Sequence, residues 1–220
     1  ITEISGEKVL AGSEEVASAK VILVTTREAD LTALKDVNLE ISNGNVVANE
    51  KMQSSLKNVY VPGDVNGKNL LAHAAFKMGD IVASEIVEGK SDKYNNNIIP
   101  RAIYTYPEIG SVGLTEEEAK KSYDVKVGKF NYGANGRALA HGDSSGMVKI
   151  ISDARYGEIL GAHIVGPRAS ELINEVSILM QSEVIVEEAI KMVFGHPTFS
   201  EAIYEAIADV EGVSVHLPKK

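Results

Sequence analysis

The order of elements in the second half of the chain constrains its fold more than any other feature. After residue 98, β-branched and apolar runs come first and amphipathic helical patterns follow. The expected strands are 102–105, 126–132, 146–152 and 157–165, and the expected helices are 169–182, 186–193 and 198–209. Tyr156-Gly157 predicts a turn that joins the last two strands into an antiparallel hairpin. Segregated strands and helices predict an α+β domain, an antiparallel sheet with packed helices.

The sequence before residue 98 predicts shorter elements. The first are a buried strand at 19–26 and a loop or short helix at 27–36. A hairpin of 39–41 with 45–48 around Asn43-Gly44 follows, then a strand at 58–62 and a helix at 70–87 that ends at Gly89. Residues 91–97 are a polar linker with consecutive asparagines, which is typical of a domain boundary.

Charge and composition exclude several classes of protein. The net charge of −9 argues against a nonspecific nucleic-acid binder and against a protein of anionic membrane surfaces. The chain contains no run of eighteen apolar residues and no secretory leader pattern, so we expect a cytoplasmic protein with no membrane partner. Cysteine is absent, which excludes disulfide and thiolate chemistry within the chain. No His/Asp/Glu cluster has the spacing of a metal site.

The sequence around His196 combines an imidazole with a carboxylate about one helical turn later. Pro197 disfavours helical geometry at His196, so the histidine is expected on a bend. Thr198 and Glu201 match a capping box, which predicts that a helix begins there. An imidazole beside a carboxylate can act as a general base. The alternative is that Glu201 only caps the helix and His196 is an ordinary loop residue.

Three motifs together are similar to those of the flavin-dependent disulfide oxidoreductases, and most of all to those of the dihydrolipoamide dehydrogenases. They are His196-Pro197-Thr198-x-x-Glu201, the pair Tyr60–Val65 and Leu70–Ala75, and the run Ile99–Thr115. The resemblance covers almost the whole chain and implies its C-terminal portion. It implies the end of an NAD-binding α/β domain at 1–58, a returning FAD-domain segment at 59–97 and an interface (dimerisation) domain at 98–220.

The resemblance also implies cofactor contacts. In the family, the aspartate that corresponds to Asp64, which follows Gly63, binds the ribityl chain of FAD. The family residues that correspond to Leu70, Leu71, Ala72 and His73 begin a helix whose amides approach the flavin. A plain turn is the alternative for Gly63-Asp64. Near the NAD site the family usually has glycine before arginine, where this chain has Thr26 before Arg27.

By resemblance, the parent enzyme oxidises dihydrolipoyl groups on acyltransferase or glycine-cleavage carriers and passes electrons through a disulfide and FAD to NAD. His196 is then the acid/base, Glu201 orients it, and the pair serves the other subunit of a homodimer. Phe194 stands where many such enzymes have a second histidine. The chain has no Gly-x-Gly-x-x-Gly and no cysteine pair, so it cannot complete the reaction unaided. A reductase of the glutathione or mercuric type and a stand-alone noncatalytic dimerisation module are the alternatives.

Two further segments are expected to be scaffold. Gly133–Ala138 lacks the spacing of a phosphate-binding loop and is expected to be a plain loop, and the glycines 110 and 113 are expected to set a turn. The apolar stripe on 169–180 is expected to pack in the core or at a dimer contact.

Overall fold

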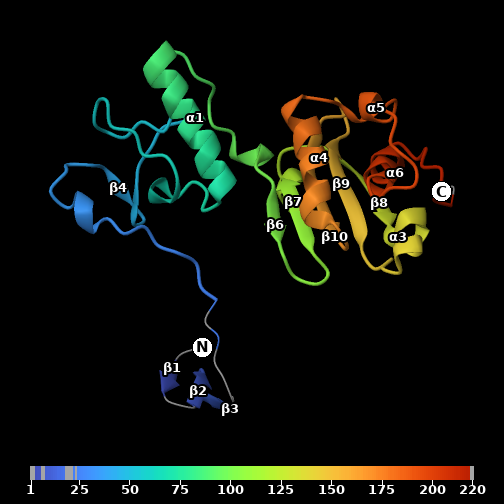
Figure 1. Cartoon of the computed structure of the whole chain (residues 1–220), viewed down its shortest axis with the longest axis horizontal. Helices are drawn as coiled ribbons and strands as arrows, with labels where there is room; N and C mark the ends of the chain where they lie inside the picture. The colour runs from blue at the N-terminus through green and yellow to red at the C-terminus, as the bar shows by residue number, and fades with distance from the viewer. Residues whose placement is uncertain (1–2, 6–7, 18–21, 23, 219–220) are drawn as a thin grey trace. The chain divides into compact units, whose positions relative to one another are not determined.

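The structure is a computed structural model that describes residues 3–5, 8–17, 22 and 24–218. The chain divides into two compact units, residues 1–83 and 84–220 (Figure 1). Helix α1 (Ala72–Glu88) runs across the boundary between them. Among the described residues, no helix combines the length and the apolar character that crossing a membrane requires.

A five-stranded antiparallel sheet forms the centre of the C-terminal unit. Its strands are β6 (Arg101–Ile103), β7 (Ile109–Gly113), β8 (Val125–Asn131), β9 (Met147–Asp153) and β10 (Ile159–Val165). Their order is β6-β7-β10-β9-β8. Strands β9 and β10 form the expected hairpin, with Gly157 at a positive φ of 70° in its turn. The predicted antiparallel sheet with helices is confirmed.

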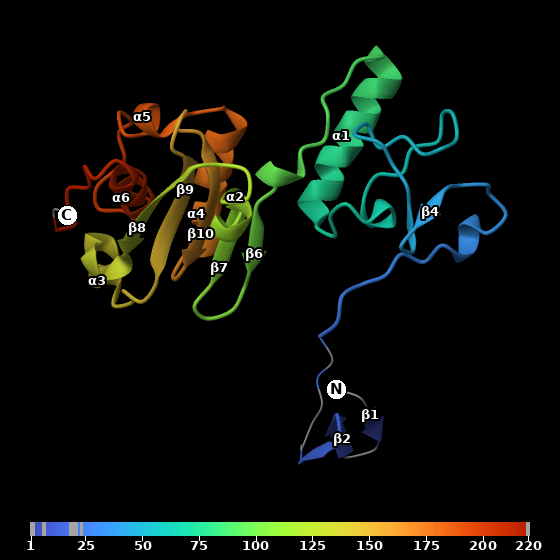
Figure 2. The same ribbon diagram turned by 180° about the vertical axis from the view of Figure 1, so that it is seen from behind.

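Two helices cover one face of this sheet, as Figures 1 and 2 show. Helix α4 (Ala169–Gln181) packs on β7 and β10, and helix α6 (Glu201–Val210) packs on β8 and β9. The core between these helices and the sheet includes Phe130, Tyr132, Ile150, Ile164, Ile173, Val176, Ile203 and Ile207. The stripe on α4 therefore packs in the core, as expected. Burial of such side chains is the main favourable term in folding.

Shorter helices complete the unit. They are α2 (Glu116–Ala119), α3 (Gly136–His141) and α5 (Val186–Ala189). Thr115 and Glu118 form a complete capping box at the start of α2. On the opposite side of the sheet from α4, Ala119 of α2 joins Ile151 and Leu160 in a second small apolar cluster. Helix α5 is shorter than the predicted 186–193.

Two predictions in this unit are wrong. The glycines 110 and 113 lie in strand β7 rather than in a turn, because Gly110 lets helix α4 approach so closely that a Cβ there would overlap the Ala169 carbonyl oxygen. The expected loop at Gly133–Ala138 instead contains a 3-10 turn (Tyr132–Ala134) and the start of α3. Asn135 caps α3 by accepting a hydrogen bond from the Ala138 N–H.

The N-terminal unit contains small sheets. Strands β1 (Glu3–Ser5), β2 (Lys8–Ala11) and β3 (Glu14–Ala17) form an antiparallel sheet, and β4 (Ile41–Ser42) pairs with β5 (Asn45–Val46). The second pair is the predicted hairpin, with Asn43 and Gly44 at φ 49° and 77° as a type I′ turn requires. A 3-10 turn (Thr32–Leu34) lies in the segment expected to be a loop or short helix.

Two predicted strands of this unit are not observed. Residues 19–21 and 23 of the strand predicted at 19–26 lie outside the described residues, while 22 and 24–26 are not in a strand. Ile22 and Val24 are exposed rather than buried, and no described strand pairs with this segment. At 58–62 only an isolated bridge between Gln53 and Tyr60 forms. An apolar run becomes a strand only where a neighbouring strand pairs with its backbone groups.

Candidate active site

The predicted imidazole and carboxylate are in direct contact in the C-terminal unit. His196 lies on a bend before α6, and Glu201 is the first residue of that helix. The distance between His196 Nδ1 and Glu201 Oε1 is 2.8 Å. The His196 side chain is 74% exposed, whereas that of Glu201 is 20% exposed. The carboxylate is thus held at the helix end, while the imidazole is accessible from solvent.

The start of α6 differs from the predicted capping box. The Glu201 half is present, since the Thr198 N–H donates to Glu201 Oε2 at 2.8 Å. The Thr198 hydroxyl, however, donates to the Gly195 carbonyl oxygen at 2.7 Å instead of accepting from the helix. Helix α6 therefore begins at Glu201, three residues later than predicted, and Thr198 closes the bend that carries His196.

The surroundings of Glu201 lower the pKa of its carboxyl group. Although its partial burial alone would raise the pKa of Glu201, the hydrogen bonds from the Thr198 N–H and from His196 hold that pKa below its ordinary value. The positive charges of protonated His196 and His216 act in the same direction. A carboxylate of this kind fixes one ring nitrogen of the histidine and leaves the other to exchange protons.

Asn135 supports the bend from a distant part of the chain. Its side chain is buried, and its amide nitrogen donates to the Thr198 carbonyl oxygen at 3.1 Å. The same side chain caps α3, so one residue links two segments that are 63 positions apart. Sequence reasoning missed this role, and the only signal was an asparagine directly before a helix-forming run.

Phe194 is partly buried and packs on α6 through an aromatic contact. Its ring centroid lies 5.5 Å from that of Tyr204. The position that the resemblance associates with a second histidine is therefore occupied here by an aromatic side chain that packs on the helix.

A second imidazole–carboxylate pair lies one turn further along α6, and sequence reasoning missed it. His216 Nδ1 is 2.7 Å from Glu205 Oε1, and the Glu205 side chain is only 3% exposed. The backbone N–H groups of Val215 and His216 and the Ser214 hydroxyl also donate to Glu205. Glu205 therefore anchors the C-terminal segment to α6.

The residues expected to contact a flavin lie together in the N-terminal unit. Asp64 begins a 3-10 turn (Asp64–Asn66), and its carboxylate is 3.2 Å from the Arg27 guanidinium. The same guanidinium donates to the Leu70 carbonyl oxygen at 2.6 Å. Arg27 thus joins the aspartate to the segment that leads into α1, where Leu71, Ala72 and His73 follow.

The backbone here suits the close approach of a ligand. Gly63 is buried, and its φ of 85° and ψ of −160° form a conformation that residues other than glycine rarely adopt. Helix α1 begins at Ala72, and the Ala75 N–H makes a hydrogen bond to the Leu71 carbonyl oxygen. The N–H groups of the first turn of α1 form the positive end of this seventeen-residue helix. A half-exposed carboxylate, a glycine turn and this helix end fit the hydroxyl chain and ring of a flavin.

No group of three His, Cys, Asp or Glu side chains within the described part of the chain is placed to hold a metal ion. The His196–Glu201 pair can accept and return protons, and the Asp64 region can bind a polyhydroxylated cofactor. These two sets of residues lie in different units.

Comparison with known proteins identifies the family. Residues 99–207 match the dimerisation domain of the pyridine nucleotide-disulphide oxidoreductases, and residues 1–79 match the pyridine nucleotide-disulphide oxidoreductase family itself. The chain belongs to this family.

Curated relatives that match this chain include dihydrolipoyl dehydrogenases from bacteria and mammals. One from Bacillus subtilis is 39% identical over 184 residues, which are 83% of this chain and 40% of the relative. The mitochondrial protein of Sus scrofa is 36% identical, over 93% of this chain and 41% of its own length. The chain therefore spans less than half the length of these relatives.

Solved structures show the same fold. The HOCl-induced flavoprotein disulfide reductase RclA of Escherichia coli, solved as a Cu(II) complex, matches with a TM-score of 0.83 and 24% identity. The match covers 92% of this chain and 47% of that one.

Proposed function

We propose that this chain is the C-terminal part of a dihydrolipoyl dehydrogenase, in which His196 is the acid/base and Glu201 its orienting partner. The observation that carries the proposal is the 2.8 Å contact between His196 Nδ1 and Glu201, which leaves an exposed imidazole on a bend. The named relatives at 35–39% identity supply the reaction class.

The geometry supports the role of an acid/base for His196. With Nδ1–H donating to the carboxylate, Nε2 carries the lone pair that accepts a proton. A dithiol is mostly protonated at neutral pH, and its thiolate is the attacking species. A proton of one substrate thiol passes to Nε2, and its thiolate attacks a redox disulfide supplied by the remainder of the enzyme, which breaks that S–S bond, forms a mixed disulfide and releases one enzyme sulfur as a thiolate. The second substrate sulfur then attacks the mixed disulfide, which closes the product disulfide and releases the other enzyme sulfur. Glu201 stabilises the imidazolium that holds the proton until it passes on from Nε2.

Gly63, Asp64 and the segment Leu70–His73 would hold FAD, which when bound takes up the electron pair and passes it to NAD. The Asp64 carboxylate is suited to accept hydrogen bonds from the ribityl hydroxyls. Arg27 keeps that carboxylate in place and balances its charge. The helix-end amides of α1 suit the electron-rich edge of the ring.

The partners follow from the same reaction. We propose a homodimer, which the match to a dimerisation domain supports, and a substrate carried on lipoyl domains of 2-oxo acid dehydrogenase or glycine-cleavage complexes. We propose the cytoplasm as its compartment, in line with the expectation from the sequence.

The test is His196→Ala in the full-length enzyme. Loss of the base should lower dihydrolipoamide oxidation by about 10²–10⁴-fold, while the flavin absorption of the purified protein is unchanged. His141→Ala is the matched control, because that exposed histidine packs on the Phe199 ring rather than on a carboxylate. Near-normal turnover of His196→Ala would contradict the role. Activity on glutathione disulfide in place of lipoamide would move the enzyme to a different branch of the family.

A further inference from the structure

The bend that carries His196 is organised by Thr198, whose N–H, hydroxyl and carbonyl oxygen each make a hydrogen bond. The N–H donates to Glu201, and the hydroxyl donates to the Gly195 carbonyl oxygen. These two contacts stay within the bend and the start of α6, so they fix the shape of the bend. The carbonyl oxygen accepts from the side chain of Asn135 at 3.1 Å. This third contact fixes where the bend lies relative to α3.

Asn135 is a firm support because its own atoms are held on two sides. The residue is only 3% exposed. Its Oδ1 accepts from the Ala138 N–H at 2.9 Å, and its backbone N–H donates to the Tyr132 carbonyl oxygen at 2.9 Å. With backbone and side-chain oxygen both fixed, the amide nitrogen has one direction left in which to donate. A group held in this way can position a catalytic side chain closely.

The next residue of the bend, Phe199, packs on the same part of the chain. Its ring centroid lies 6.0 Å from that of Tyr132, which is fully buried in the 3-10 turn before α3. Apolar contact of this kind is not directional, whereas a hydrogen bond has a preferred distance and angle. The ring contact therefore holds the bend against the core, and the hydrogen bond from Asn135 determines its position.

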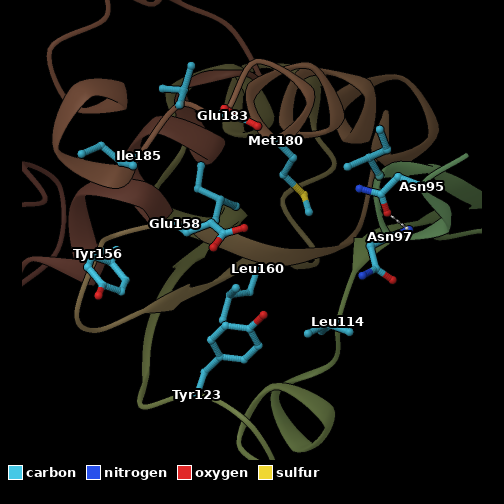
Figure 3. A pocket seen from close by; sticks show the side chains of 13 residues that line it. Asn95, Asn97, Leu114, Tyr123, Tyr156, Glu158, Leu160, Met180, Glu183 and Ile185 are labelled. Atoms are coloured by element: carbon cyan, nitrogen blue, oxygen red, sulfur yellow. Dashed lines mark hydrogen bonds between the residues drawn. The ribbon is translucent and has the colours of Figure 1, made fainter. Parts of the chain in front are cut away.

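The cavity of this unit lies elsewhere. It has a volume of about 470 Å³, and Leu160, Met180 and Tyr123 are among the side chains that line it (Figure 3). Of the described residues, none that lines it belongs to α3 or to the His196 bend. A change at Asn135 therefore reaches the acid/base through Thr198 and not through this cavity.

We propose that Asn135 is a positioning residue for the acid/base reaction, in which it holds the Thr198 carbonyl group and so sets the place of the His196 imidazole. The inference rests on the proposed function. A general base must lie within hydrogen-bond distance of the proton that it takes, so a small displacement slows the reaction steeply. Because Asn135 acts through Thr198 rather than on the substrate, its loss should lower kcat and leave KM nearly unchanged.

Two variants separate this contact from the folding of α3. Asn135→Ser keeps an oxygen that can cap α3, since serine is a good N-cap residue, but its side chain is too short to reach the Thr198 carbonyl oxygen. Ala138→Gly is the matched control. It keeps the contact between Asn135 and Thr198 but weakens α3, because glycine disfavours a helix and a buried methyl group is lost. We expect Ala138→Gly to lower the thermal midpoint by about 2–4 °C.

The test compares two reactions of the full-length enzyme. Asn135→Ser should lower kcat for dihydrolipoamide oxidation by about 10- to 100-fold, whereas Ala138→Gly should leave it near the wild-type value. Reduction of ferricyanide by NADH passes through the flavin without a substrate thiol, so neither variant should change it. Loss of both reactions in Asn135→Ser, or an equal loss of dihydrolipoamide oxidation in Ala138→Gly, would show general structural damage and would overturn the proposal.

A double-mutant cycle with His196→Ala separates this inference from the proposed function. If Asn135 acts through the imidazole, Asn135→Ser should not slow flavin reduction by dihydrolipoamide any further once His196 is replaced. Additive losses would overturn the positioning role. Normal turnover of Asn135→Ser beside an impaired His196→Ala would overturn this inference alone. Normal turnover of His196→Ala would overturn the proposed function and this inference with it.

Discussion

At the scale of single residues, Glu201 serves both the chemistry and the fold. One carboxylate oxygen orients the His196 imidazole and the other accepts the Thr198 N–H at the start of α6. The role of Glu201 as the partner of His196 and its role as a helix cap do not exclude each other, because the two carboxylate oxygens make different contacts.

This double contact predicts a pH-dependent contribution to stability. The pKa of Glu201 in the folded protein is below its ordinary value of 4.5, so the carboxylate stabilises the fold above that pH and its contribution is lost as pH falls through the lower, folded value. We expect Glu201→Gln to reduce the free energy of unfolding by about 1 kcal/mol at pH 7, with the difference shrinking at pH 3. Urea unfolding of both proteins at the two pH values measures it. A difference that did not change with pH would rule out an ionic origin.

At the scale of elements, the contact of α6 with β8 decides where the site lies. Gly128 of β8 is the point of closest approach, where a Cβ would overlap the Ala206 carbonyl oxygen and crowd the Val210 amide. The helix that carries Glu201 and Glu205 can therefore lie flat on the sheet only if this position has no side chain.

We expect Gly128→Ala to lower the free energy of unfolding by about 2–4 kcal/mol, since backbone atoms of the helix cannot move aside as a flexible side chain could. Gly133→Ala is the matched control, because a Cβ there meets no atom within 4 Å. Chemical denaturation measures both. Equal effects of the two substitutions would mean that the cost is not steric.

The elements also show what a sequence can predict. The hairpin at Asn43-Gly44 and the contact of His196 with Glu201 each depend on residues within five positions, where turn and helix geometry fix the distance. The contacts of Asn135 with Thr198 and of Glu205 with His216 link positions 63 and 11 residues apart, and no local pattern marks them. Strand β7 was not predicted, because its glycines allow α4 to pack closely on the sheet and do not form a turn.

At the scale of the whole molecule, the match to a dimerisation domain predicts self-association. Large apolar side chains directly before the His196 bend are open to solvent in the single chain, with Val193 97% and Met192 41% exposed. Exposed apolar surface of this kind is typical of a protein interface.

We expect the chain to sediment as a dimer and Val193→Asp to shift it towards monomer, because a charge buried at the interface is left without a partner. Val87→Asp is the control, as Val87 is 82% exposed on α1. Analytical ultracentrifugation over a concentration series measures the dissociation constant. A purely monomeric wild-type chain, or a Val193→Asp chain with the wild-type constant, would place the interface elsewhere.

The spacing of Glu201 and Glu205 on α6 restricts insertions and deletions in this segment during evolution. The two carboxylates are four residues apart and so lie on one face of the helix, where one holds His196 and the other holds His216. Inserting or deleting one residue between them would rotate all that follows by about 100° and carry Glu205 away from the C-terminal segment. Loops elsewhere in the chain can tolerate such changes in length. The helical turn between Glu201 and Glu205 can change by substitution but not by insertion or deletion.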